Sequence, residues 1–286
     1  MSATVPHPVP PSMASRSGRV VANEVVSGGA HRIEFEVAGG WPATRAGQFV
    51  MLSLDDPEFP LLPRPFSLLG CQSGDEGEAD HVEFLVMPVG KGSGLICSVK
   101  VGAEANLVGP MGHAVEADVP EGPLVCVAGG YGVAPFIFLL EQWTREGRKQ
   151  GEDVTVVFGA RTKERLSLAD RLEASASRVL LCTDDGSKGL EGRVDEALTN
   201  LLQEESPTMI LTCGPEAMME AVGKVAVKAQ VPARASLETV MGCGYAVCNG
   251  CAVAVHSDQH PEGYTYELAC REGTVFDESR LLWHPL

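Results

Sequence analysis

Basic residues are scarce in this sequence. The 286 residues include 22 Lys and Arg against 38 Asp and Glu, which gives a formal net charge of −16 at pH 7. A surface that binds nucleic acid needs a basic face to neutralise the phosphates, so this balance argues against a nucleic-acid partner. The acidic charge does not select any other partner.

Long uninterrupted apolar runs are also missing. The best candidate for a membrane span, residues 123–140, is near the minimum length and is split by Gly129, Gly130 and Gly132. A buried strand, a glycine turn and an amphipathic helix account for it better. The Pro- and Ser-rich start lacks the apolar block of a signal peptide, so residues 1–16 are expected to be a disordered tail. We expect a soluble, cytoplasmic protein without a membrane span.

The cysteines do not suit a disulfide framework. Their number, nine, is odd, and no secretory signal directs the chain to an oxidising compartment. Four of them form a pattern near the C-terminus: Cys243, Cys248 and Cys251 follow a C-x4-C-x2-C spacing, and Cys270 stands apart. Plant-type ferredoxins hold a [2Fe–2S] cluster with this spacing. The alternative is a structural zinc site, which more often uses two separated C-x2-C pairs.

A cluster of this kind moves one electron at a time, so the pattern predicts an electron carrier. Three thiolates on one short loop must converge on two irons. Glycines at positions 242, 244 and 250 suit such a tight loop, because glycine accepts dihedral angles that other residues avoid.

The chain is expected to form two domains and a small third module. Short apolar runs between Gly and Pro signals, such as the strictly alternating His31–Val37, predict a small antiparallel β-barrel over residues 17–118. Residues 119–235 alternate apolar runs with helical patterns, which predicts an α/β domain with a parallel sheet. Residues 236–286 return to Gly, Cys and short β segments and form the predicted cluster module.

Two glycine- or proline-containing segments of the barrel region are candidate anion-binding sites. Arg64, Pro65, Phe66 and Ser67 combine a cation that can pair with a pyrophosphate, an aromatic ring and a hydroxyl. Gly90, Lys91, Gly92 and Ser93 follow an apolar strand and open a short helix, so their N–H groups could face an anion. Taken alone, the first segment is a weak signal that many surface turns resemble, and the second could equally be a plain hairpin turn.

Two segments of the α/β region are placed where nucleotides bind in parallel sheets. Gly129, Gly130 and Gly132 lie between a strand and a helix without the G-x-G-x-x-G spacing, and a tight turn would explain them equally well. Cys213 ends a later strand, and ligands of such sheets sit beyond the carboxyl ends of the strands. It is therefore a candidate to contact a nicotinamide, although a buried inert Cys is the commoner role.

Taken together and in this order, the motifs resemble the ferredoxin–NADP reductase superfamily. The match consists of R-P-F-S, G-K-G-S, G-G-Y-G-V-A-P and C-G-P, and the cysteine loop narrows it to the electron-transfer subunits of dihydroorotate dehydrogenase B. The resemblance spans about residues 18–280 and includes the run Ser236-Leu237-Glu238 before the cysteine loop. It implies an FAD-binding barrel, an NAD-binding domain and a [2Fe–2S] module.

The resemblance also implies roles for individual residues. Arg64 would hold the FAD pyrophosphate, Phe66 and Ser67 would lie against the isoalloxazine, and the turn 90–93 would contact the ribityl chain or pyrophosphate. Gly130 and Gly132 would admit the nicotinamide nucleotide. The four iron ligands would be Cys243, Cys248, Cys251 and Cys270.

The resemblance implies a partner as well. It would be an FMN-containing catalytic subunit that oxidises dihydroorotate to orotate in pyrimidine biosynthesis, assembled with this chain as a heterotetramer. Two alternatives stay open: an NAD(P)H oxidoreductase subunit that serves ferredoxin, sulfide or polysulfide, or a hydrogenase, and a zinc-stabilised module that binds a nucleotide without turnover. Arg161 and Lys163 could accept a 2′-phosphate, but solvated surface charges are the simpler interpretation, which favours NADH.

Overall fold

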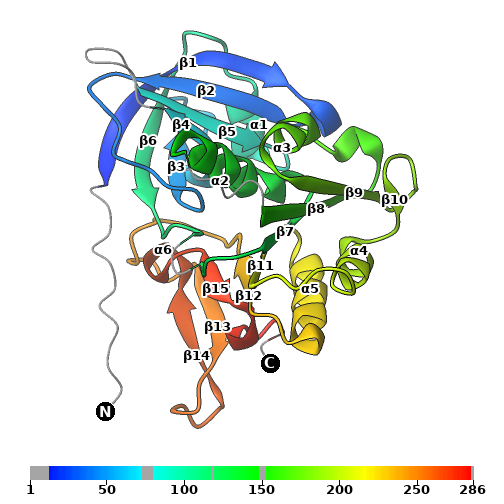
Figure 1. Ribbon diagram of the computed structural model, residues 1–286. Helices are drawn as coiled ribbons and strands as arrows, with labels where there is room; N and C mark the ends of the chain where they lie inside the picture. Colours follow the sequence, from blue (N-terminus) through cyan, green and yellow to red (C-terminus); the bar gives the residue numbers. More distant parts are fainter. Residues whose placement is uncertain (1–12, 73–79, 117–118, 148–152, 285–286) are drawn as a thin grey trace.

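The computed structural model describes residues 13–72, 80–116, 119–147 and 153–284 (Figure 1). A β-barrel lies at the top of Figure 1, a sheet flanked by helices lies below it, and a small hairpin module forms the bottom. The three predicted parts are therefore all present. They meet near the middle of the molecule, where the candidate site lies.

The barrel is closed, with strand order β1-β2-β5-β4-β3-β6 and antiparallel pairing throughout. In β2 the alternation is confirmed, because Ile33, Phe35 and Val37 are buried while their neighbours are half-buried. The Phe35 ring meets Phe84 edge to face, with centroids 5.8 Å apart. The strands are β1 (Ala14–Val25), β2 (His31–Val37), β3 (Phe49–Ser53), β4 (Arg64–Gln72), β5 (Asp80–Val86) and β6 (Glu104–Met111), with helix α1 (Lys91–Cys97) between β5 and β6.

The start of the barrel differs from the expected tail. Strand β1 begins at Ala14, which pairs with Gly109 of β6, so the last three residues of the expected tail 1–16 belong to the barrel. Residues 1–12 of that tail lie outside the described residues. Backbone pairing with β6 orders a segment that composition alone describes as polar and irregular.

The second domain is a seven-stranded sheet with the order β10-β9-β8-β7-β11-β12-β15. All neighbours pair in parallel except β15, which runs antiparallel to β12. The strands are β7 (Leu124–Gly129), β8 (Val154–Ala160), β9 (Arg178–Thr183), β10 (Leu190–Glu191), β11 (Met209–Cys213), β12 (Ala233–Ser236) and β15 (Val275–Asp277). The helices are α2 (Ala134–Arg145), α3 (Ala169–Ser175), α4 (Val194–Leu201) and α5 (Glu216–Ala229).

The strand order reverses direction between β7 and β11, because β8 and β9 extend to one side of β7 while β11 and β12 extend to the other. Open parallel sheets bind ligands at such a point, beyond the carboxyl ends of the strands. Residues 123–140 supply β7 and the start of α2, as expected. No helix in the described parts of the chain is long and apolar enough to cross a membrane.

The C-terminal module consists of the cysteine loop, the hairpin β13 (Ala252–His256) and β14 (Tyr264–Leu268), and helix α6 (Ala269–Glu272). The chain then returns to the α/β sheet as β15, where Arg234 Nε donates to Asp277 Oδ1 at 2.9 Å. The module also contacts the barrel, since Thr274 Oγ1 donates to the Gly47 carbonyl at 3.1 Å. It is therefore tied to both domains.

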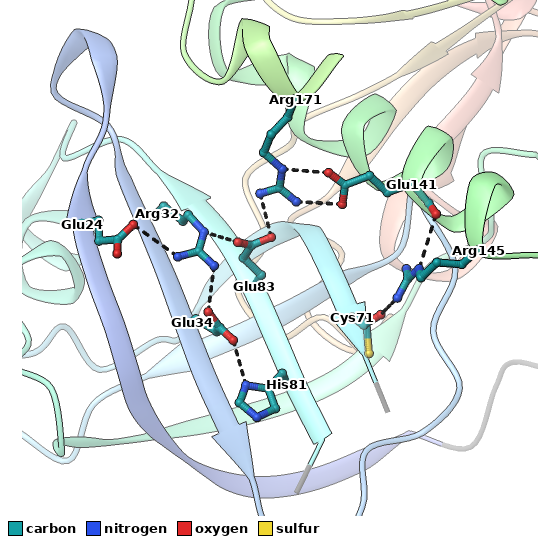
Figure 2. A network of polar contacts seen from close by, with 9 residues as sticks. All are labelled: Glu24, Arg32, Glu34, Cys71, His81, Glu83, Glu141, Arg145 and Arg171. Atoms are coloured by element: carbon teal, nitrogen blue, oxygen red, sulfur yellow. Dashed lines mark hydrogen bonds and ion pairs between the residues drawn. The ribbon is translucent and has the colours of Figure 1, made fainter. Parts of the chain in front are cut away.

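A network of ion pairs joins the barrel to the α/β domain (Figure 2). Arg171 of α3 binds both oxygens of Glu141 on α2 at 2.8 Å and reaches Glu83 of β5 at 3.0 Å. Glu83 also pairs with Arg32 of β2, and Arg145 of α2 donates to the Cys71 carbonyl at 2.9 Å. Although desolvation opposes it, these carboxylates raise the pKa of Arg171, so its charge is held across the domain boundary.

Replacing Arg171 with methionine is expected to lower the free energy of unfolding by about 2 kcal/mol, because Glu141 loses its bidentate partner and Glu83 keeps only Arg32. Urea unfolding measures the change. Arg161→Met, at an exposed position of the same domain, is the matched control and should change stability by less than about 0.5 kcal/mol. Equal losses in the two variants would show that the network adds no stability.

Candidate cofactor cavity and thiol cluster

A cavity of about 360 Å³ lies where the barrel, the α/β domain and the cysteine module meet. Its walls come from β4, the turn before α1, the turn after β7, the end of β11 and the segment that follows β12. Most of the residues predicted to bind cofactors line it: Arg64, Pro65, Phe66, Ser67, Gly90, Lys91, Gly92, Ser93, Gly132 and Cys213. Gly129 and Gly130 are not part of this wall.

Arg64 lies on this wall as the first residue of β4, where it pairs with Leu52 of β3. Its Nη1 donates to the carbonyls of Leu62 at 2.7 Å and Pro63 at 3.2 Å, which fixes the direction of the side chain. Within the described residues no carboxylate pairs with it. A Cβ on Gly92 would lie 3.1 Å from Arg64 Nε, so glycine there gives the guanidinium room. This arrangement fits a phosphate ligand.

The turn at 90–93 is held by its own serine. Ser93 Oγ accepts hydrogen bonds from the N–H groups of Val89 at 3.1 Å and Gly90 at 3.0 Å. The Lys91 ammonium pairs with Glu58 at 3.2 Å and is largely exposed. Ser93 therefore shapes the turn, and a ligand at this wall would meet the backbone and the Arg64 guanidinium more readily than the Ser93 hydroxyl.

The three glycines after β7 have different surroundings. A Cβ on Gly132 would lie 2.5 Å from the Cys213 carbonyl oxygen, and one on Gly129 would lie 2.9 Å from Pro215 Cδ, so these two let the β7 and β11 turns touch. Gly130 has a φ of 56° and nothing within 4 Å of its Cβ position. Gly130 is thus the glycine with open space beside it, and its role toward a nucleotide stays a prediction.

Cys213 lies on the cavity wall at the switch point of the sheet and is buried. Burial raises its pKa well above the ordinary thiol range, and the charge of Glu238 adds to this effect. Cys213 is therefore a neutral thiol at physiological pH. A neutral thiol can pack against a flat ring but does not act as a nucleophile. The geometry therefore allows Cys213 to contact a nicotinamide, which is the role predicted for it.

The four C-terminal cysteines come together as two pairs of thiols. Cys251 and Cys270 are buried, with their Sγ atoms 3.1 Å apart. Cys243 and the exposed Cys248 form the other pair, linked by a hydrogen bond. Among the described residues no three side chains of the metal-binding types close around a single ion. Two pairs suit a centre in which each of two irons takes two thiolates.

Each of the four sulfurs accepts a backbone N–H. The donors are Tyr245 to Cys243 at 3.3 Å, Gly250 to Cys248 at 3.4 Å, Cys270 to Cys251 at 3.5 Å, and Ala246 to Cys270 at 3.1 Å. Such bonds stabilise thiolate charge and tune the potential of iron–sulfur centres. Desolvation opposes the effect at Cys243, but its backbone hydrogen bonds lower the pKa to about 7.

Left-handed backbone conformations shape the cysteine loop. Gly244, Ala246 and Asn249 have φ values of 82°, 59° and 56°. The conformation of Ala246 is unusual for a residue with a Cβ, and its N–H is the one that bonds Cys270 Sγ. A Cβ on Gly244 would lie 2.9 Å from Met51 Cγ, so glycine lets the loop settle on the barrel. The donor set therefore fits the predicted [2Fe–2S] cluster.

The cavity and the cysteine loop share one apolar core. Phe49 and Met241 line the cavity and belong to the same buried cluster as Cys251 and Cys270. The buried thiol pair thus packs in the same core as part of the cavity wall, while Cys248 is exposed to solvent. A redox group in the cavity and one in the loop would be separated by a layer of packed side chains.

Comparison with known proteins addresses both halves of the site. Residues 126–224 match the family model described as an oxidoreductase NAD-binding domain, and residues 238–282 match the iron–sulfur cluster binding domain of dihydroorotate dehydrogenase B. The dihydroorotate dehydrogenase B (NAD(+)) electron transfer subunit of Desulforamulus reducens is 31% identical over 93% of this chain and 97% of its own length. This chain belongs to the family of dihydroorotate dehydrogenase B electron transfer subunits.

Other similar proteins support the same family assignment. The probable dihydroorotate dehydrogenase B electron transfer subunit of Methanocaldococcus jannaschii is 37% identical over 77% of this chain and 81% of its own length. A solved structure of an NADH-dependent reduced ferredoxin–NADP oxidoreductase superposes with a TM-score of 0.75 at 25% identity, covering 93% of this chain and 90% of that one. The predicted fold and the predicted cofactors, FAD, NAD(H) and an iron–sulfur cluster, are confirmed by these matches.

Several residues of the cavity wall were not among the predicted site residues. Tyr131, Glu238, Thr239, Met241 and Thr274 all line the cavity. The Thr239 hydroxyl is buried and has no hydrogen-bond partner among the described residues, so it is available to a ligand. Glu238 follows the end of β12 by two residues, and that position at the switch point is the signal that could have singled it out.

Proposed function

We propose that this chain passes electrons between NAD(H) and the redox centre of a catalytic subunit, using FAD in the cavity and a [2Fe–2S] cluster on the cysteine loop. The catalytic subunit, which we take to carry FMN, would oxidise dihydroorotate to orotate in pyrimidine biosynthesis. The observation that carries the proposal is the shared core of Phe49, Met241, Cys251 and Cys270, which joins the cavity to the buried thiol pair.

FAD, when bound, exchanges electron pairs with NAD(H) and single electrons with an iron–sulfur cluster. The chain's own residues bind and orient these groups. Arg64 would pair with the FAD pyrophosphate, and Phe66 and Ser67 would flank the flavin ring on the same strand. Cys213 and Gly132 would border the nicotinamide at the switch point. Cys243, Cys248, Cys251 and Cys270 would hold the irons.

The proposal is tested by recovering the tagged chain anaerobically from its own cells. We expect it to copurify with a second, FMN-containing subunit and to catalyse dihydroorotate-dependent reduction of NAD. The similarity to a ferredoxin-linked oxidoreductase favours the main alternative, a subunit that serves ferredoxin. Flavin, iron and NADH oxidation without dihydroorotate activity would support that alternative.

The face around Cys248 is the proposed contact with the catalytic subunit, because the thiol loop reaches solvent there. Large apolar side chains on this loop are exposed: Val240 at 84%, Tyr245 at 45% and Val247 at 79%. Leu62 is also exposed, and its Cδ1 lies 3.7 Å from the Cβ position of Gly242. A group of exposed apolar side chains of this kind is typical of a protein interface.

Replacing Val247 with aspartate is expected to weaken assembly with the catalytic subunit by at least about tenfold, because a charge would be buried at the contact. Iron and flavin content should stay unchanged. Val101→Asp is the matched control, because Val101 is 65% exposed. It precedes the start of β6, and the opposite end of that strand, at Met111, is the end that contacts the cysteine loop. Sedimentation of the two variants with the partner measures the effect, and equal binding would contradict this docking face.

A cytoplasmic location is part of the same proposal. All nine cysteines are free thiols, and four of them are the proposed iron ligands. Free thiols and thiolate ligands persist in a reducing compartment.

A further inference from the structure

A second hollow, of about 300 Å³, lies between the barrel and helices α2 and α3 of the α/β domain (Figure 2). None of its described lining residues belongs to the cofactor cavity. The two sites lie at opposite ends of β4, because Arg64 begins that strand in the cavity and Gly70 lines the hollow. At about 3.3 Å per strand residue, these two positions are roughly 20 Å apart. The hollow is therefore separate from the proposed electron path.

Charged side chains form most of this lining. They are three arginines and three glutamates: Arg32, Arg145, Arg171, Glu34, Glu83 and Glu141. These six charges balance, although the whole chain has a formal net charge of −16. Gly70 leaves room for one of the carboxylates, because a Cβ there would lie 3.0 Å from Glu83 Oε2.

The three carboxylates are already fully engaged. Both oxygens of each one contact a basic side chain: Glu83 pairs with Arg32 and Arg171, Glu141 with Arg171 through both oxygens, and Glu34 with Arg32 and His81. Every nitrogen of the Arg32 and Arg171 guanidinium groups likewise donates to a carboxylate. These groups therefore neutralise one another and have little capacity left for a ligand.

Arg145 differs from the other two arginines. It lies four residues after Glu141 on α2, a spacing at which opposite charges on a helix commonly pair. Because Arg171 binds both Glu141 carboxylate oxygens, Arg145 Nε reaches only the Glu141 backbone carbonyl, at 3.4 Å. Its Nη1 donates to the Cys71 carbonyl at 2.9 Å, which holds the guanidinium against β4. Within the described residues no carboxylate pairs with Arg145, and its Nη2 has no hydrogen-bond partner.

Two further polar side chains line the hollow from the barrel side. Gln72 of β4 and His81 of β5 are partners across the two strands. The Gln72 amide makes no hydrogen bond among the residues that the structure describes. His81 Nδ1 contacts Glu34 at 2.8 Å, which leaves Nε2 for a ligand. A molecule held by Arg145 in this hollow would thus meet polar groups of both domains.

We propose that the hollow binds a small polar molecule through a phosphate or carboxylate group on Arg145. Such a group would supply the counter-charge that Arg145 lacks, and a guanidinium binds both kinds of oxyanion through paired hydrogen bonds. A volume of about 300 Å³ is at the lower end of the range for small-molecule sites. Because Arg145 belongs to the α/β domain while Gln72 and His81 belong to the barrel, the bound molecule would hold the two domains together.

The test is calorimetric titration of the FAD-bound protein, saturated with NAD, with inorganic phosphate and separately with succinate. Bound cofactors keep either anion out of the cofactor cavity, and sodium chloride holds the ionic strength constant. We expect saturable binding of at least one anion, and the tighter one identifies the ligand as phosphorylated or carboxylic. Arg145→Gln should weaken this binding at least about tenfold. Arg145→Lys should recover only part of it, because an ammonium cannot form the paired contact.

The matched control is Arg16→Gln. Arg16 is also exposed and donates to backbone carbonyls, those of Gly40 at 3.2 Å and Ser15 at 3.1 Å, but it lies on the barrel outside the hollow. This variant should bind the anion like wild type. The melting temperature gives a second measurement, since a ligand that binds only the folded state stabilises it. The anion should raise the Tm of wild type and Arg16→Gln above its value in chloride, but not that of Arg145→Gln.

Three outcomes would overturn this site. The first is that neither anion binds saturably. The second is equal affinity in wild type and Arg145→Gln, which would place the anion elsewhere, and the third is an equal loss in Arg16→Gln and Arg145→Gln, which would indicate a general charge effect. The flavin spectrum verifies that each variant is folded. If Arg145→Gln does not retain FAD, Arg145→Lys decides the question, and wild-type affinity in that variant rules out the paired contact.

Discussion

A Cys248→Ala variant is expected to lose its iron, by at least about tenfold, while FAD stays bound. The cysteine is exposed, so its removal disturbs little packing, and loss of iron can be ascribed to the missing ligand. FAD should remain because Arg64 and the 90–93 turn lie in the cavity rather than on the loop. Iron and acid-labile sulfide analysis, with the flavin spectrum of the same sample, measures both quantities.

The matched control for this variant is Cys71→Ala. Cys71 is partly exposed, lies on β4 of the barrel, and has a pKa that burial raises to about 11, so it is a neutral thiol outside the loop. This variant should keep full iron content. Full iron in Cys248→Ala as well would mean that the ligand assignment is wrong.

An Arg64→Ala variant is expected to bind FAD about 10- to 100-fold more weakly, because a pyrophosphate in the cavity would lose a charge-assisted hydrogen bond. Iron content should be unaffected, since the thiol loop settles on Met51 and Met111 rather than on Arg64. Titration of the flavin-free protein with FAD, followed by flavin fluorescence, gives the two dissociation constants.

Two further variants show whether geometry or charge matters at Arg64. Arg64→Lys should restore only part of the affinity, because an ammonium cannot form the planar, two-pronged contact of a guanidinium. Lys100→Ala, at an exposed lysine of the barrel, should bind FAD like wild type. Equal FAD affinity in Arg64→Ala and wild type would remove Arg64 from the flavin site.

The sequence predicted those elements whose signal is local. Strand β2 was predicted at His31–Val37 because apolar and polar residues alternate strictly, and Cys213 was predicted to end a later strand, which is β11 (Met209–Cys213). The four cysteines were found for the same reason, since three of them fall within nine residues. In the structure they lie as two pairs of thiols, and their role as iron ligands stays a prediction.

Features that depend on distant pairing were not predictable. Strand β15 was assigned to the C-terminal module, yet it completes the α/β sheet by pairing with β12 about forty residues earlier. Glu238 looked like one residue of a short family match, and only the arrangement of β11 beside β12 places it on the cavity wall. Glycine patterns likewise did not distinguish Gly130, which has open space, from Gly129 and Gly132, which allow two turns to touch.

The different exposure of the two thiol pairs affects how stable a bound cluster would be toward oxygen. Cys251 and Cys270 are buried within the apolar core, whereas Cys248 is exposed to solvent. Dissolved oxygen and chelators therefore reach the loop from the side of Cys248, which is the side that the catalytic subunit would cover. The isolated chain should lose its cluster in air sooner than the assembled complex, so assembly protects the cluster as well as supplying its electrons.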